Sequence, residues 1–137
     1  MATNTPGTTA RKNVEQQVGY LRFPVNWNDA PGINMKQWLP AGAVLIGTDV
    51  QIVTPFNAAT TNVLSVGYEA TTAANIVTSA QAVAGTAGLK QNLPPNGVAL
   101  LPLAADVQVG ALYTQTGGAA TAGQAIVIVK YIPNNDL

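Results

Sequence analysis

The side chains that most often carry catalysis are scarce in this chain and widely spaced. Among its 137 residues there is no Cys and no His. This composition excludes a thiolate nucleophile, a disulfide and the general base that most often works near neutral pH. Two serines, Ser65 and Ser79, are present, and neither lies in a Gly-x-Ser-x-Gly turn. The sequence therefore predicts no catalytic residue and a protein that is not an enzyme.

Metal and cofactor sites also lack their usual ligands. A metal site would depend on oxygen alone, and no two of the six carboxylates lie within four residues of one another. These carboxylates are Glu15, Asp29, Asp49, Glu69, Asp106 and Asp136. The glycine-rich stretch 116–123 lacks the lysine and the following helix of a phosphate-binding loop, so it is interpreted as a hairpin turn. We expect no metal and no cofactor.

Charge is sparse and balanced. Six basic and six acidic residues give a net charge of zero, and charged residues are 9% of the chain, against about 25% in ordinary soluble domains. The one adjacent basic pair, Arg11 and Lys12, is soon followed by Glu15, which argues against nucleic acid as a partner. So few charges at zero net charge favour a protein that works in an assembly, as a homo-oligomer or on a larger particle.

Hydropathy argues against a membrane partner. The longest apolar runs, at 41–46, 98–105 and 125–129, are far shorter than the roughly 20 residues that span a bilayer. The first ten residues are polar and rich in Thr, without the basic and then apolar order of a signal peptide. We therefore expect synthesis in the cytoplasm.

Period-two alternation of apolar and polar residues predicts strands along most of the chain. The expected strands are 18–25, 43–54, 62–68, 89–93, 98–103, 106–116 and 124–132. In the second of these, one face is expected to hold Val44, Ile46, Thr48, Val50 and Ile52. The second and third are expected to form a hairpin. The last is apolar on both faces, so we expect it to be central in a sheet or covered on both sides.

Two stretches are less regular. Residues 26–40 hold Asn, Asp, Pro and Gly, which favour turns, together with both tryptophans. Residues 70–88 allow two interpretations: a short helix within 73–83, or a loop with a brief strand.

The strand count defines the expected fold. About seven or eight antiparallel strands without a long helix predict an all-β chain, either a jelly roll or a β-sandwich. Residues 18–137 are expected to form this single domain. Residues 1–17 show no hydrophobic periodicity and are interpreted as a flexible N-terminal arm.

Trp27 and Trp38 are the most informative side chains for binding, since Trp combines a large apolar area with one hydrogen-bond donor. One interpretation is an exposed contact loop for a partner protein or a glycan, the latter suited by Asn26, Asn28 and Asp29. The other is that both tryptophans cap the open end of a small sandwich core.

Two segments carry a resemblance to a known family. Residues 41–70 (AGAVLIGTDVQIVTPFNAATTNVLSVGYEA) resemble a long strand, a turn rich in Asn and Thr and a return strand of small structural proteins of tailed bacteriophages. Residues 112–132 (LYTQTGGAATAGQAIVIVKYI) resemble the closing hairpin of the same class. The chain is thus similar to the jelly-roll cement, or decoration, proteins of short-tailed phage capsids, such as that of the Bordetella phage.

The resemblance implies a function. It implies a virion protein, favoured as a homodimer, that binds the outside of the major capsid protein shell and staples neighbouring capsomers against the pressure of packaged DNA. By position and chemistry alone, the expected capsid contacts are Arg11, Lys12, Arg22, Trp27 and Trp38. The alternative is a head-fibre or tail-associated module that recognises a glycan on the host surface.

Overall fold

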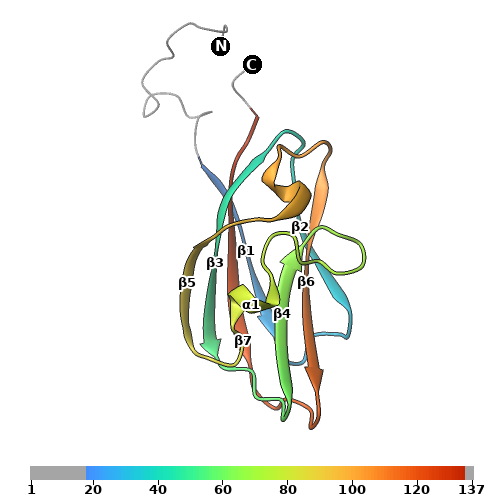
Figure 1. Ribbon diagram of the computed structural model, residues 1–137, viewed down its shortest axis with the longest axis vertical. Coiled ribbons are helices and arrows are strands. Elements are labelled where there is room, and N and C mark those ends of the chain that lie inside the picture. Colours follow the sequence, from blue (N-terminus) through green and yellow to red (C-terminus); the bar gives the residue numbers. More distant parts are fainter. Residues whose placement is uncertain (1–17, 135–137) are drawn as a thin grey trace, which may run out of the picture.

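A computed structural model describes residues 18–134 of the chain, and these form two antiparallel sheets packed face to face (Figure 1). One sheet has the strand order β1-β7-β3-β5 and the other the order β2-β6-β4. The strands are β1 (Gly19–Asn26), β2 (Ile33–Leu39), β3 (Val44–Thr54), β4 (Thr61–Gly67), β5 (Gly88–Leu93), β6 (Val107–Thr116) and β7 (Gln124–Ile132). The expected all-β sandwich of about seven strands is confirmed.

Consecutive strands alternate between the two sheets for most of the chain. β1, β3, β5 and β7 lie in one sheet, and β2, β4 and β6 lie in the other. This is the jelly-roll arrangement with one strand fewer than the usual eight. β7 is central, with β1 on one side and β3 on the other, as its two apolar faces predicted.

A short segment replaces the missing strand beside β4. Val77 forms an isolated antiparallel bridge with Val66, and the two residues exchange backbone hydrogen bonds of 3.0 and 2.9 Å. The segment therefore satisfies some of the backbone hydrogen-bonding groups on the free edge of β4. These groups would otherwise be open to pairing with another chain. One turn of helix, α1 (Ser79–Ala82), follows and leads to β5 in the other sheet. Both interpretations of this region, a short helix and a brief strand, are thus partly right.

The core lies between the sheets. Alternate residues of β1 and β7 face inward, and facing them across the sandwich are residues of β4 and β6. The fully buried side chains include Val25, Val127 and Val129 from one sheet and Leu64, Val66 and Val109 from the other. Phe56 and Tyr113 close the core near the connections 55–60 and 117–123, with ring centroids 4.5 Å apart.

Two expected hairpins are wrong. β3 and β4 lie in different sheets, and so do β6 and β7, so the connections 55–60 and 117–123 cross the sandwich instead of closing a two-stranded ribbon. Turn residues between alternating strands mark where the chain reverses, but they do not determine which sheet receives the next strand. The closing hairpin inferred from the resemblance is therefore corrected as well.

A bulge in β3 overturns the expected face of this strand. The pairing of β3 with β7 shifts register between Leu45 and Gly47. Leu45 is buried before the bulge, and Thr48, Val50 and Ile52 are buried after it. The extra residue at the bulge reverses the alternation. Val44 and Ile46 therefore point to solvent, with exposed fractions of 39% and 44%.

Two further expectations are corrected by local structure. Residues 33–39, expected as part of a turn-rich stretch, form β2, whose alternation is masked by a bulge between Met35 and Trp38. The expected strand 98–103 is instead a turn of 3₁₀ helix, η2 (Gly97–Leu100), followed by irregular chain. Gly97 enters this turn with φ of 57°, which suits glycine, and Pro102 cannot donate a hydrogen bond to a strand partner.

Gly67 is required by the segment that covers β4. A Cβ at this position would lie 2.4 Å from Oδ1 of Asn75 and 2.7 Å from the backbone carbon of Ala73. Gly67→Ala is expected to lower the free energy of unfolding by about 1–3 kcal/mol, because the crowded backbone must shift. Urea unfolding of the purified protein measures this change.

Gly85→Ala is the matched control. No atom lies within 4 Å of a Cβ built on Gly85. This variant is expected to be neutral or to gain up to about 1 kcal/mol from the lower entropy of its unfolded chain. Equal effects of the two substitutions would contradict the packing explanation.

Candidate functional site: contact surfaces

Large apolar side chains are exposed mainly at one end of the sandwich, which we call the apolar end. Eight of the fourteen exposed large apolar residues in the described chain lie there. β1 begins and β7 ends at this end, and the turn between β2 and β3 and the segment around η2 lie beside them (Figure 1). The eight residues are Val18, Tyr20, Val44, Ile46, Val98, Leu100, Leu101 and Ile132.

Strand pairing and loop hydrogen bonds hold the apolar end together. Val44 lies directly opposite Ile132 in the pairing of β3 with β7. The segment that carries η2 is tied to the turn before β3, because Leu103 donates to Ala43 O at 3.0 Å. Leu100 and Leu101 are each 64% exposed, whereas Leu103 is only 5% exposed. These two leucines therefore contribute little to the core.

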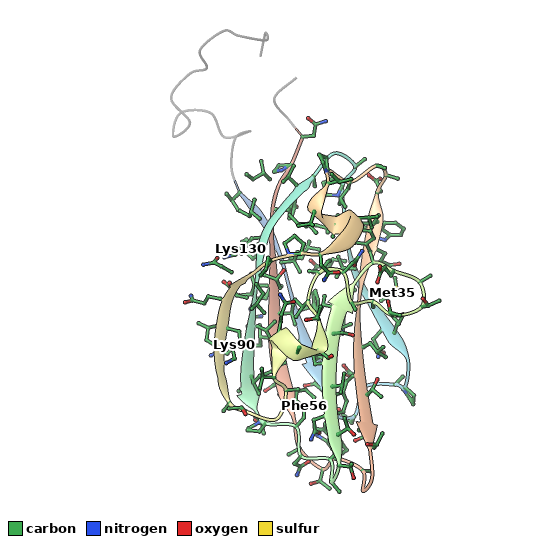
Figure 2. All side chains as sticks on the ribbon, in the orientation of Figure 1. Met35, Phe56, Lys90 and Lys130 are labelled. Atoms are coloured by element: carbon green, nitrogen blue, oxygen red, sulfur yellow. The ribbon has the colours of Figure 1, made fainter. Side chains whose placement is uncertain are left out.

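A groove lies on the outer face of the second sheet. Its volume is about 460 Å³, and its lining includes Ile33, Met35 and Trp38 of β2 together with Gly67 and Tyr68. Met35 and Trp38 are 53% and 60% exposed. In Figure 2, Met35 lies on the side of the molecule that carries β2, and Lys90 and Lys130 lie on the opposite side.

The opposite end of the molecule is polar, and Trp27 lies there. Trp27 follows β1 directly, is 37% exposed and donates its backbone N–H to Gly123 O at 3.0 Å. It borders two hollows of about 330 and 310 Å³. Tyr113 lines the second hollow, and burial raises the pKa of its hydroxyl, which donates to Asn62 Oδ1 at 2.8 Å.

The structure separates the residues expected to contact a capsid. Trp27 and Trp38 lie near opposite ends of the sandwich, because the length of β2 runs between them. Neither caps the core, so both the single contact loop and the capping interpretation are wrong. Arg22 is exposed on the outer face of the first sheet, with buried Leu21 and Phe23 on either side. Arg11 and Lys12 lie outside the described residues.

Sequence inspection missed the apolar end. The sequence places Val98 and Leu101 in a strand, and Val44 and Ile46 on the same face as Val50 and Ile52, so it does not predict their exposure. The signals that could have revealed it are Gly97 and Pro102 around the first pair, and Gly47 at the bulge for the second.

One cluster of charged and polar side chains is structural. Lys130 Nζ lies 3.2 Å from Asp49 Oδ1, and the same carboxylate oxygen accepts the backbone N–H of Asn92 at 2.9 Å. This contact ties the irregular edge strand β5 to β3 and β7. Within residues 18–134, no group of three His, Cys, Asp or Glu side chains is placed to hold a metal ion. No helix in that range has the length and apolar character needed to cross a bilayer.

Comparisons with known proteins identify the fold. No protein-family model matches the chain, and a search of curated protein sequences gave no significant match. Solved structures of three phage capsids contain similar chains, each 18% identical to this one. That of cyanophage Pam1 has a TM-score of 0.64 over 96% of this chain and 93% of its own.

The other two similar chains come from different hosts. The chain in the acid-stable capsid of Helicobacter pylori bacteriophage KHP30 has a TM-score of 0.62 over 85% of this chain and 87% of its own. The chain in the capsid of Ralstonia phage GP4 has a TM-score of 0.57 over 88% and 86%. The protein therefore shares its whole β-sandwich fold with chains of similar length found in phage capsids.

The exposure of Leu100 and Leu101 leads to a prediction about stability. Replacing both with Ser is expected to change the free energy of unfolding by less than about 1 kcal/mol, since neither side chain is buried in the folded protein. Leu103→Ala, in the same segment but buried, is expected to cost about 2–5 kcal/mol. Thermal or urea unfolding distinguishes the two. A large loss in the double Ser variant would mean that the apolar end stabilises the fold itself.

Proposed function

We propose that the protein is a viral structural protein of a bacteriophage, a capsid cement or decoration protein. In this role it binds the outside of the shell of the major capsid protein and staples neighbouring capsomers against the pressure of packaged DNA. It is not an enzyme in this proposal, and its location is the capsid surface of the virion.

The whole-length fold match is the observation that carries this proposal. The aligned region is 85–96% of this chain and 86–93% of the matched chains, so each matched chain is a small capsid component about the size of this one. A size of this kind fits an accessory cement protein better than the main shell subunit. Fold alone does not determine function, so the role must also agree with the surface.

The apolar end is the surface that best fits the shell. Exposed apolar residues gathered at one end of a protein often mark a surface that binds a partner. Removing apolar surface from water contributes about 25 cal/mol per Å², so Val98, Leu100 and Leu101 would supply much of the contact energy. Trp38, near the end of β2 that leads to the same turn, extends this surface onto the groove. Arg22 and the N-terminal residues Arg11 and Lys12 remain proposed contacts.

Copy number in purified virions tests the role. A cement protein is expected in several hundred copies, in fixed ratio to the major capsid protein, and particles that lack it should break more readily on heating. The second hypothesis, a head-fibre or tail-associated glycan-binding module, requires only about a dozen copies. Quantitative gel densitometry, followed by a particle reconstruction, separates the two hypotheses. Light scattering on the free protein tests the proposed homodimer.

A variant of the apolar end tests the proposed surface. Replacing Leu100 and Leu101 with Ser is expected to weaken binding to particles that lack the protein by at least about tenfold, because contact residues of this kind carry most of the binding energy. Leu89→Ser is the control, since Leu89 is 52% exposed but lies on β5, away from the apolar end. Binding is measured by co-sedimentation over a concentration series. Equal loss in both variants, or none in either, would exclude the apolar end as the docking surface.

A further inference from the structure

The end of the sandwich opposite the apolar end holds a polar site that the cement role does not use. Three connections meet there and are joined by backbone hydrogen bonds. Trp27 N donates to Gly123 O at 3.0 Å, and Ala59 N donates to Gly118 O at 3.0 Å. The side chain of Asn57 accepts the backbone N–H groups of Thr121 and Ala122 at 2.9 and 3.0 Å. These bonds give the end a fixed frame.

Trp27 stands between two hollows in this frame. The first hollow, about 330 Å³, is bordered by a row of polar residues from three neighbouring strands, since Asn26 and Thr54 each lie opposite Gln124. The second, about 310 Å³, is bordered by Asp29 and by Gln115 of β6. Each hollow has the size of a small ligand site, which starts at roughly 300 Å³. Because Trp27 borders both hollows, a ligand that occupies both would contact it.

We propose that this end binds a neutral oligosaccharide across Trp27. The indole supplies an apolar surface for the C–H face of a sugar ring, and the neighbouring side-chain amides supply the complementary polar groups. The side chains of Asn28 and Gln124 can each donate and accept hydrogen bonds, as a row of sugar hydroxyls requires. Gln115 Oε1 already accepts the backbone N–H of Ala120 at 2.8 Å, so this side chain can serve mainly as a donor. An open, polar pair of hollows suits successive sugar units.

Charge selects the kind of glycan. Among residues 18–134, Asp29 is the one charged residue that borders either hollow, and it is acidic. Its Oδ2 accepts the backbone N–H of Asn26 at 3.0 Å, which holds the carboxylate in the turn after β1. Since none of the described residues that border the hollows is basic, this site disfavours sulfated, phosphorylated or carboxylated sugars, and it disfavours nucleic acid for the same reason. The site is therefore specific for neutral sugars.

The two tryptophans of the chain provide a direct test. In the full-length Trp38→Phe variant, Trp27 is the single source of tryptophan fluorescence, and in Trp27→Phe the single source is Trp38. Acrylamide quenching is measured with hexasaccharides of glucose, galactose, mannose and N-acetylglucosamine, and with hyaluronan as an anionic probe. At least one neutral hexasaccharide is expected to protect Trp27 in the first variant, with a dissociation constant of the order of 1 mM, and to leave Trp38 unaffected in the second.

Substitutions at the site separate stacking from polar contacts. Trp27→Ala is expected to weaken binding at least about tenfold in calorimetry, and Gln124→Ala severalfold, whereas Trp38→Ala should bind normally. Far-UV circular dichroism and the unfolding midpoint check that each variant is folded. If Trp27→Ala fails to fold, the quenching result on Trp38→Phe still decides the question.

Three outcomes would overturn the proposal. These are no protection of Trp27 by any neutral hexasaccharide, equal protection of Trp38, and stronger binding of hyaluronan than of the neutral sugars. Protection of Trp27 in assembled particles without sugar would instead place a protein partner at this end. The copy number of the protein in virions is independent of all these results, so the site and the cement role can fail separately.

Discussion

The pairing of β7 between β1 and β3 is the constraint on which the rest of the structure depends. It joins the first and last described strands, about a hundred residues apart, and places Val127 and Val129 at the centre of the core. Because the described chain starts and finishes within one pair of strands, both of its ends emerge at the same end of the sandwich. Pairing between residues so far apart in the sequence makes slow folding the expected behaviour.

Alternation between sheets then determines which residues meet. Every crossing connection lies at one end of the sandwich except residues 68–87, which run along the edge of β4. The other loops therefore gather into two groups, and the strands run between them. The group at the apolar end carries Leu100 and Leu101, and the group at the opposite end carries Trp27 and its neighbouring amides. Because each strand runs from one end of the sandwich to the other, residues close in sequence can lie far apart. β2 carries the chain from the polar end near Trp27 to Trp38 near the apolar end.

The sequence predicted the class of fold because alternation is local, and it failed where structure depends on distant partners. Strands such as β6 and β7 were located within one or two residues, and β7 was correctly placed at the centre. The sheet that receives each strand depends on inter-sheet packing, so both hairpins were wrong. One bulge at Gly47 is enough to place Val44 and Ile46 on the face opposite the buried Val50 and Ile52. One of the two interpretations of Trp27 and Trp38 expected exposed side chains, but neither expected their separation, since it required the path of β2.

The different chemistry of the two ends has a consequence for orientation on a particle. β7 has nine residues, and at about 3.3 Å per residue it spans about 30 Å, so a shell bound at the apolar end leaves the Trp27 end well clear of it. Covering apolar residues permanently carries no cost of lost hydration, whereas covering amides and a carboxylate removes well-bound water. The polar end therefore suits reversible contact. In the proposed arrangement, attachment to the shell and recognition of sugars use opposite ends, so a substitution that alters one need not disturb the other. Separation of the two surfaces along the strands would also let a chain with so few charges carry both proposed functions, since each would depend on a few residues held by the same sandwich.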